Sequence, residues 1–395
     1  MSIRQNFPTT PPSLVLDFAN SKTLDPRITF SRTTTATRMN ELGLIETVDA
    51  DVARFDHKYE NGVIKSLGLL VEESRSNLVT YSEDFSQWTL PSSITITPNN
   101  IVSPDGTQNA DLVSTTVNES GPSVSITASQ NTTYTLSVFL KYGNTPTIRL
   151  RDFDGGTNPG HHVIFNLLTQ TFSSALNLDD YGYIPYPNGW YRVWMTFTTG
   201  SYTNLSLQVR SASEVSGDET FYAWGGQIEP GPSPTSYIPR PDTSTATRNP
   251  DTVTMTGNNF SNWYNPSEGT VFVDSLVKYN PEATKFVWSL YGGSIDHSLR
   301  QPHLTGLRFR AVIGGAFTPA PGTGFNATNG STTKAAVAYD STTGRLQVGT
   351  SGDDVTMIGT ADPTIFKIGP HNGTISKLTY YPTRLTNAQL QTLTK

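Results

Sequence analysis

The sequence predicts an all-β fold, with two β-sandwich domains of the jelly-roll or lectin-like type in tandem after an extended N-terminal segment. Short alternating or β-branched segments recur between turn residues, which is the pattern of all-β sandwiches. Helical periodicity is almost absent from the 395 residues. Aromatic residues make up 10% of the chain and charged residues 15%, a composition that argues against a disordered chain.

The first 85 residues differ in composition from the rest of the chain. They are rich in Thr, Arg and Asp, and their apolar pieces, such as residues 14–18 and 68–71, are short. A segment with so little apolar sequence buries too little surface to fold alone. We therefore expect residues 1–85 to form an extended arm that docks on another structure.

Residues 86–240 are expected to form the first sandwich. Its strands are expected at residues 92–97, 123–127, 134–141, 147–151, 190–198 and 204–210. A proline-rich stretch, residues 229–242, follows these strands. Because proline donates no ladder hydrogen bond and stiffens extended chain, this stretch is interpreted as a semi-rigid connector, with a domain boundary near residues 235–255.

Residues 241–395 are expected to form the second sandwich and a short C-terminal helix. The strands are expected at residues 270–279, 286–291, 306–313, 334–339, 345–349 and 374–381. Thr386 and Gln389 have the spacing of a capping box, and Leu385 and Leu390 that of a hydrophobic staple. This pattern predicts a helix over residues 387–393.

Charge and cysteine content exclude several classes of function. The chain has 27 Lys and Arg against 33 Asp and Glu, a net charge of −6, which argues against a nucleic-acid partner bound by a basic face. It has no cysteine, which excludes disulfides, thiolate nucleophiles and Cys-ligated metals. The longest apolar runs, residues 67–71 and 311–317, are far too short to span a bilayer, so no membrane insertion is expected.

Several motifs resemble those of a known family. The first block comprises residues 24–32 (LDPRITFSR), 54–57 (RFDH), 68–78 (GLLVEESRSNL) and 81–88 (YSEDFSQW). A second block comprises residues 103–107 (SPDGT), 188–192 (NGWYR), 224–229 (WGGQIE) and 234–239 (PTSYIP). Residues 375–378 (ISKL) and 385–390 (LTNAQL) end the chain in a looser pattern. These blocks resemble a family of tailed-phage virion proteins with a carbohydrate-binding-module-like jelly roll and a concanavalin-A-like (laminin-G-like) lectin domain.

The resemblance implies a location and partners. Such proteins are tail fibre, tailspike or head fibre subunits, so the chain is expected on the virion surface after synthesis in the host cytoplasm. Residues 1–85 correspond to the virion-attachment end and are expected to bind other virion proteins. A homotrimer is expected from the same resemblance.

The segment at residues 190–198 holds the first candidate binding residues. Tyr191 and Val193 fall on one face of the strand, while Trp190, Arg192 and Trp194 fall on the other. Two indoles beside a guanidinium can stack on a sugar ring and hydrogen-bond its hydroxyls. The alternative is that Trp190 belongs to the packing of the jelly roll and that Trp194 lies under a loop.

A second group of candidates precedes that strand. Asp180, Tyr181, Tyr183 and Tyr186 are expected in one loop, and carboxylates beside stacking tyrosines are typical of sugar sites. The alternative is a contact with another subunit, because Tyr is also enriched at protein interfaces. No cofactor is expected. Asp152 and Asp154 supply closely spaced oxygens among glycines, which could bind calcium, but the full calcium-loop pattern is missing and Asp and Gly also form ordinary turns.

These observations predict a non-enzymatic fibre or spike subunit that binds host surface polysaccharide. No Gly-x-Ser-x-Gly, His-Glu-x-x-His or phosphate-loop motif is present. The alternative function is purely structural, in capsid decoration or in joining tail parts. The third hypothesis is a glycan-cleaving enzyme. In a structure, such an enzyme would show two carboxylates that face each other across the position of the scissile bond.

Overall fold

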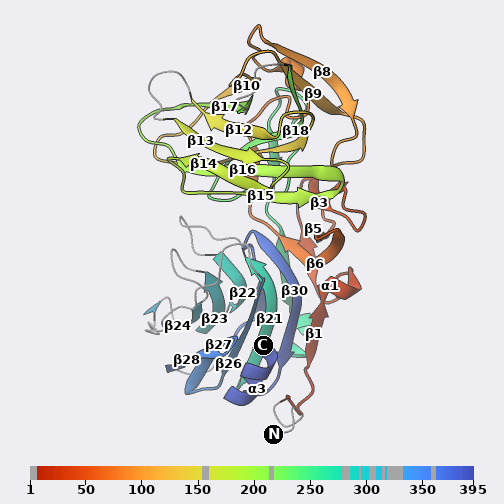
Figure 1. Cartoon of the computed structure of the whole chain (residues 1–395). Helices are drawn as coiled ribbons and strands as arrows, with labels where there is room; N and C mark the ends of the chain where they lie inside the picture. Colours follow the sequence, from red (N-terminus) through yellow and green to blue (C-terminus); the bar gives the residue numbers. More distant parts are fainter. Residues whose placement is uncertain are drawn as a thin grey trace.

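The computed structural model describes residues 7–153, 160–212, 218–277, 285–292, 295–301, 308–313, 316–317, 332–356 and 362–395. These residues form two β-sandwiches, one above the other in Figure 1. The described helices are short, and none is long and apolar enough to cross a membrane. The all-β prediction is confirmed.

The first sandwich pairs two antiparallel sheets. We call one the β16 sheet, which has the order β15-β16-β11-β18-β9-β8, and the other the β12 sheet, which has the order β10-β17-β12-β13-β14. The strands of the β16 sheet are β8 (Ile94–Ile101), β9 (Ala110–Thr115), β11 (Thr133–Tyr142), β15 (Asp180–Tyr186), β16 (Trp190–Thr198) and β18 (Glu219–Pro230). Those of the β12 sheet are β10 (Ser123–Thr127), β12 (Thr147–Asp152), β13 (His161–Asn166), β14 (Thr171–Leu176) and β17 (Asn204–Ser211).

Alternation along each strand places the apolar face inside this sandwich. On β16, Val193, Met195 and Phe197 are buried and pack in the core between the two sheets. On β12, Ile148 and Leu150 enter the same core from the opposite sheet. The period of two thus leaves the other face of each sheet outside the core, and those two outer faces are where ligands can reach.

The second sandwich also has two sheets, and both include strands from the start of the chain. One sheet has the order β28-β27-β26-β21-β30-β6-β5, with β1 paired to β30, and the other has the order β2-β20-β29-β22-β23-β24-β25. The N-terminal strands are β1 (Leu14–Asp17), β2 (Thr29–Ser31), β5 (Arg54–Glu60) and β6 (Val63–Val71). The others are β20 (Thr252–Thr256), β21 (Gly269–Val277), β22 (Lys285–Tyr291), β23 (Ile295–Gln301), β24 (Arg308–Ile313), β25 (Ala316–Phe317), β26 (Thr332–Tyr339), β27 (Thr343–Val348), β28 (Ser351–Thr356), β29 (Ile365–Ile368) and β30 (Gly373–Tyr381).

The prediction of an extended N-terminal arm is therefore corrected. Leu14, Leu16, Phe18, Phe55 and Leu69 are buried in the core of the second sandwich, together with residues from the last third of the chain. The segment has little core of its own, as its composition indicates, but it completes the core of a domain that begins some 170 residues later. Single-sequence reasoning missed this because the pairing of β6 with β30 is set by contacts far apart in sequence.

Among the described residues, two short antiparallel pairs and three short α-helices complete the fold. The pairs are β3 (Ala36–Met39) with β4 (Ile45–Val48), and β7 (Arg75–Asn77) with β19 (Ala246–Arg248). The α-helices are α1 (Phe18–Ser21), α2 (Asn258–Ser261) and α3 (Asn387–Thr394). In α3, Thr386 and Gln389 form the expected capping box, which confirms the C-terminal helix.

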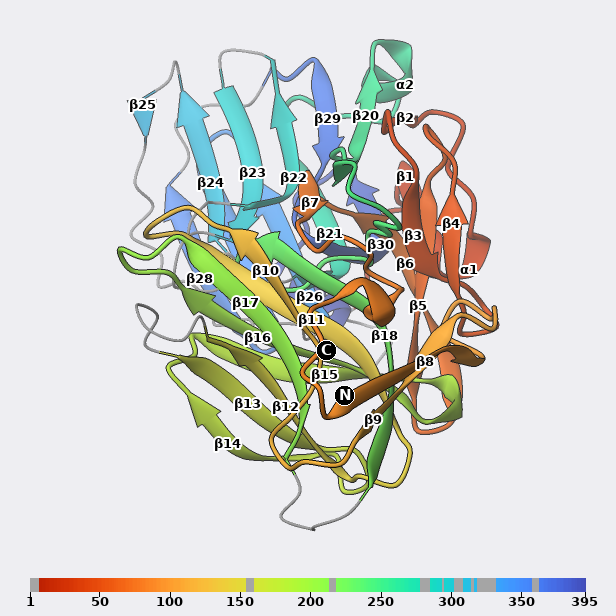
Figure 2. The ribbon, with the colours of Figure 1, turned by 90° about the horizontal axis from the view of Figure 1, so that it is seen from above.

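The proline-rich connector is not a free linker between the sandwiches. Tyr237 and Ile238 are 3% and 6% exposed, and the hydroxyl of Tyr237 lies 2.7 Å from that of Ser82 and donates to Glu83. In the view from above, the strands of the first sandwich cross over those of the second (Figure 2). The connector is thus packed into the junction between the two sandwiches.

Candidate functional site

A cleft of about 620 Å³ lies at the junction of the two sandwiches. One wall is the outer face and edge of the β16 sheet, and the opposite wall comes from the N-terminal segment, chiefly β3, β5 and β6. The connector closes the cleft at residues 233–237. Six of the seven proposed sugar-binding residues line it, namely Asp180, Tyr181, Tyr183, Tyr186, Arg192 and Trp194.

Trp194 is the lining residue best placed to meet a ligand. Its indole lies across Gly182 of the neighbouring strand β15, where an added Cβ would stand 2.8 Å from Cζ2 of the indole. The ring therefore rests flat against backbone where any side chain would displace it. Trp194 is partly exposed, so part of its apolar surface faces the cleft.

Trp190, four residues earlier on the same face, has a different environment. It is 1% exposed and packs with Phe139, Trp224 and Tyr237, and its Nε1 donates to the carbonyl oxygen of Val102 (3.2 Å). The β3–β4 hairpin covers this end of the sheet, since Ile45 belongs to the same cluster. Trp190 is therefore a core residue, and the predicted platform of two exposed indoles does not form.

Arg192 is also held inside the protein. It is 2% exposed, and its Nη1 donates to the carbonyl oxygen of Thr235 (2.6 Å) while its Nη2 donates to Oγ of Ser137 (3.0 Å). Its guanidinium lies 5.3 Å from the centre of the Phe139 ring. The prediction that Arg192 binds sugar hydroxyls is corrected, because its side chain ties the connector to the β16 sheet.

The predicted loop over residues 179–186 is an edge strand, β15, which pairs with β16. Tyr181 and Tyr183 point to the core side, where Tyr181 contacts Phe172 (5.0 Å between ring centres) and Tyr183 contacts Phe165 (4.9 Å). Asp180 accepts a hydrogen bond from its neighbour's backbone N–H (2.9 Å) and opposes Thr196 on the outer side. Because both rings pack against the core side of the sheet, the two tyrosines reach the cleft only at the sheet edge.

Tyr186 ends this strand beside Trp190. Its ring meets the ring of Phe139 edge to face, with 5.1 Å between the ring centres. Burial raises the pKa of Tyr186 to about 12, so its hydroxyl stays protonated at neutral pH. Tyr186 is thus a neutral donor or acceptor at the closed end of the cleft.

The opposite wall holds polar residues whose role the sequence reasoning missed. Burial raises the pKa of Asp56 on β5 to about 6, while its carboxylate accepts the N–H of Met39 (2.7 Å). Lys58 donates to Glu60 (2.8 Å), and Arg38 donates to Glu46 (3.2 Å). The signals for this wall in the sequence are the motifs at residues 54–57 and 68–78, which indicated a resemblance but no site.

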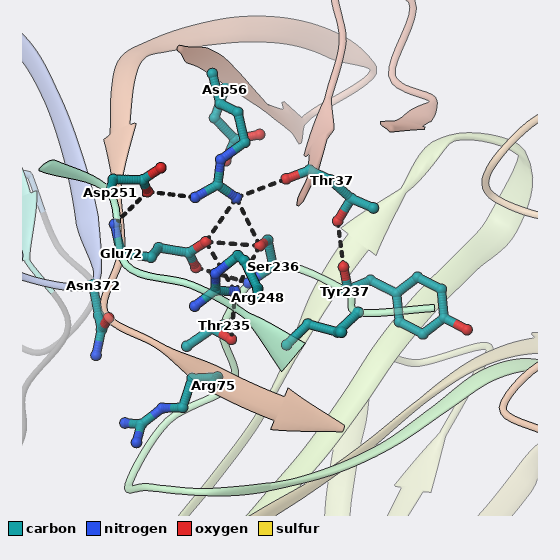
Figure 3. A network of polar contacts seen from close by, with 12 residues as sticks. Thr37, Asp56, Glu72, Arg75, Thr235, Ser236, Tyr237, Arg248, Asp251 and Asn372 are labelled. Atoms are coloured by element: carbon teal, nitrogen blue, oxygen red, sulfur yellow. Dashed lines mark hydrogen bonds and ion pairs between the residues drawn. The ribbon is translucent and has the colours of Figure 1, made fainter. Parts of the chain in front are cut away.

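A buried ionic network lies behind the cleft and holds its walls together. Arg54 donates to Glu72 (2.8 Å) and to Asp251 (2.6 Å), and Arg248 lies 3.2 Å from Glu72. Ser236 of the connector donates to Glu72 through both its backbone N–H (2.8 Å) and its hydroxyl (2.7 Å). Figure 3 shows the N-terminal segment, the connector and residues 248–251 converging on this point. Several of the family-like motifs therefore build this junction.

The candidate calcium site is not supported at Asp152. Its side chain is 0% exposed, and its two oxygens meet the backbone N–H of Ser206 (2.7 Å) and Nδ1 of His161 (3.1 Å). Asp154 lies outside the described residues. Among the residues that the structure describes, no group of three or more His, Cys, Asp or Glu side chains is placed to hold a metal ion. Asp152 instead joins β12 to the adjoining strands.

No family model and no curated protein matches the chain. Among solved structures it is similar to a Trypanosoma rangeli sialidase, at 11% identity and a TM-score of 0.28, over 72% of this chain and 60% of that one. It is also similar to the tandem CBM22-1–CBM22-2 domain of Paenibacillus barcinonensis Xyn10C, at 8% identity and a TM-score of 0.28, over 79% and 99% of the two chains.

The prediction that the chain is not an enzyme is withdrawn, since the solved structures similar to it include sialidases. A likeness with a TM-score of 0.28 carries no argument for a particular reaction or ligand. The chain also spans only 60% of the length of the sialidases that it matches. Its function is therefore inferred from the cleft itself.

Proposed function

We propose that the chain binds a polysaccharide in the cleft between its two sandwiches, with a sugar ring stacked on the indole of Trp194. The observation that carries the proposal is a partly exposed tryptophan, seated on Gly182 and facing a cleft of about 620 Å³. An indole fixed in this way offers a flat apolar surface to the C–H face of a pyranose. A cleft of this size holds a few sugar units.

The polar groups of the cleft favour an uncharged sugar. Lys58 and Arg38 are paired with Glu60 and Glu46, and Arg192 is bonded to the connector. Burial is the main cause that lowers the pKa of His57, which keeps its ring neutral at pH 7. Among the described lining residues, every cation thus has a partner within the protein. Carboxylates such as Asp180 can accept hydrogen bonds from sugar hydroxyls, and the connector's backbone can both donate to them and accept from them.

The proposed setting is the surface of a phage virion, where the chain acts as a tail fibre or spike subunit that binds host surface polysaccharide. The support is the resemblance of the motifs at residues 24–88 and 188–239 to those of tailed-phage virion proteins. Several of these motifs build the junction and the cleft walls.

The proposed partners are other virion proteins, and the proposed assembly is a homotrimer, both through the N-terminal segment. Residues on the turns and strands of this segment expose apolar side chains: Leu42 is 71% exposed, Val63 54% and Val52 49%. Exposed apolar side chains favour contact with another protein surface. Light scattering of the full chain should show a trimer, and Leu42→Ser with Val63→Ser should shift it to monomer. A monomeric full chain would contradict the proposed trimer.

The binding proposal is tested on a glycan array with purified full-length protein. We expect binding to one or a few neutral host polysaccharides, with little dependence on salt, since stacking and hydroxyl contacts are not screened. Release of reducing ends from the bound polysaccharide is measured in parallel, so that cleavage would be seen. No binding to any host polysaccharide at high protein concentration would contradict the proposal.

A further inference from the structure

Three arginines share the outer face of the β12 sheet, on the side of the first sandwich away from the cleft. Arg149 and Arg151 alternate with the core residues Ile148 and Leu150 on β12, so both point outward. Arg210 on β17 stands directly opposite Arg149 in the ladder. Strands β12, β13 and β17 lie side by side in Figure 2.

These cations are poorly compensated by the described residues. Arg149 is paired with Glu119, whereas neither Arg151 nor Arg210 has an ion pair with any residue that the structure describes. Arg151 instead lies over the ring of Phe153, 4.1 Å from its centre. Nε of Arg210 is buried without a hydrogen-bond partner among the described residues. The buried Nε–H of Arg210 thus has no acceptor among the described residues, and the guanidinium of Arg151 has no carboxylate partner among them.

Among the described residues, the carboxylates whose charges act on these arginines are Glu119, which pairs with Arg149, and Asp152. Burial, together with the charges of Arg151 and Arg149, lowers the pKa of Arg210, although an arginine remains protonated at neutral pH. His162, opposite Arg151 on β13, has its pKa lowered by burial and by the same arginines, so it is neutral and shares a hydrogen bond with Ser174 (3.1 Å). Asp152 points to the core side. Like charges directly opposite on a ladder destabilise a sheet, and a bound anion removes that penalty.

We propose that this outer face is a second binding site, for the carboxylate or phosphate groups of an acidic polysaccharide. Guanidinium groups bind such anions through paired N–H donors in a fixed plane, which a lysine cannot match. Arg149, Arg151 and Arg210 occupy two adjacent rows of the ladder, so anionic groups repeated along a polymer can meet more than one of them. Gln208 of β17 stands opposite Arg151 in the ladder and adds a polar side chain to this face. The site is separate from the cleft, whose lining comes from the β16 sheet and the N-terminal segment.

The test uses full-length protein and three probes: a hexamer of galacturonic acid, an oligomer of glycerol phosphate, and inorganic phosphate alone. We expect at least one oligomer to bind more tightly than inorganic phosphate, and the Arg151→Gln/Arg210→Gln variant to bind it at least about tenfold more weakly. Raising the salt concentration roughly tenfold should also weaken binding by the wild type, because screening shortens the range of the interaction. Whichever oligomer binds identifies the anionic group.

The control variant is Arg27→Gln/Arg345→Gln, which removes the same charge from arginines paired elsewhere with Asp25 and Asp354. It should bind the oligomer as the wild type does. The melting temperature of Arg151→Gln/Arg210→Gln should equal or exceed that of the wild type at low salt, since repulsion is removed. Binding of any neutral glycan in the cleft should be unchanged, so a failure here leaves the cleft proposal standing. Absence of oligomer binding, equal binding by both double variants, or binding of inorganic phosphate as tight as of the oligomer would overturn the proposal.

Discussion

Trp190 and Trp194 lie four residues apart on one face of β16, and the difference between them decides where a ligand can bind. The β3–β4 hairpin and the connector cover Trp190, whereas the sheet is uncovered at Trp194. Alternation along the strand places both indoles on the same face, but it gives no information on what covers that face. The sequence motif Asn-Gly-Trp-Tyr-Arg favoured a packing role for Trp190, and the structure agrees with that alternative.

Truncation of Trp190 should destabilise the protein strongly. Trp190→Ala removes a fully buried indole and leaves a cavity in the cluster with Phe139 and Trp224, which costs about 3–5 kcal/mol. Trp194→Ala removes a partly exposed ring and should cost about 1 kcal/mol or less. Urea unfolding of both variants measures the difference. Equal losses would mean that Trp194 is as much a core residue as Trp190.

Asp56 should make stability depend on pH in the mildly acidic range. Burial raises its pKa from the ordinary value of 3.8 to about 6 in the folded protein, so folding favours the protonated form. The stability that the protonated carboxyl contributes is fully present below pH 3.8 and is lost as the pH rises through about 6, by about 3 kcal/mol. The free energy of unfolding of Asp56→Asn, subtracted from that of the wild type across this range, should show the decline. A difference that is constant with pH would contradict the assignment.

At the scale of single elements, β15 shows how a polar, proline-containing segment can still be a strand. Pro185 lies in it and lacks the N–H that a central strand would need, but an edge strand leaves one side of its backbone without a partner. Gly182 opposes Trp194 and gives its indole room. From the sequence, the acidic and aromatic residues of this segment predict a loop, because the residue types that form turns also occur in edge strands.

Gly182→Ala should therefore disturb the site and spare the fold. The new Cβ would stand 2.8 Å from the indole of Trp194 and push it from its seat, so binding of a cleft ligand should weaken about tenfold, while the melting temperature changes little. Gly200→Ala is the matched control, since the atom nearest to its added Cβ, on Tyr202, is 3.8 Å away. If Gly182→Ala binds the cleft ligand as tightly as Gly200→Ala does, the position of the Trp194 indole against Gly182 does not matter for binding.

At the scale of the whole molecule, the two ends of the chain share one domain. The strand order of the second sandwich places β6 and β1 beside β30, and this pairing closes a sheet from segments some 300 residues apart. The fold class, the first group of strands and the C-terminal helix follow from local patterns, which single-sequence reasoning can detect. The N-terminal strands and the cleft do not, because both depend on which distant segments meet.

Deletion of residues 1–85 should therefore unfold the second sandwich. The deletion removes Leu14, Leu16, Phe18, Phe55 and Leu69 from a core that includes Trp288 and Tyr380, and it exposes the edge of β30. It also removes Glu72 and leaves Arg248 buried without that carboxylate, which is strongly destabilising. Circular dichroism and limited proteolysis of the truncated chain should show a digested second sandwich. A truncated protein with cooperative unfolding and protease resistance equal to those of the full chain would show that residues 1–85 are dispensable for folding.

The central claim is that the cleft binds polysaccharide through the indole of Trp194. Its most direct test is a calorimetric titration of the wild type, Trp194→Ala and Trp194→Phe with an oligosaccharide of the neutral glycan that the array identifies. Loss of the stacking surface should weaken binding by Trp194→Ala about tenfold, or about 1.4 kcal/mol, with Trp194→Phe between the two and all three proteins equally folded. Unchanged affinity in a folded Trp194→Ala protein would contradict the claim.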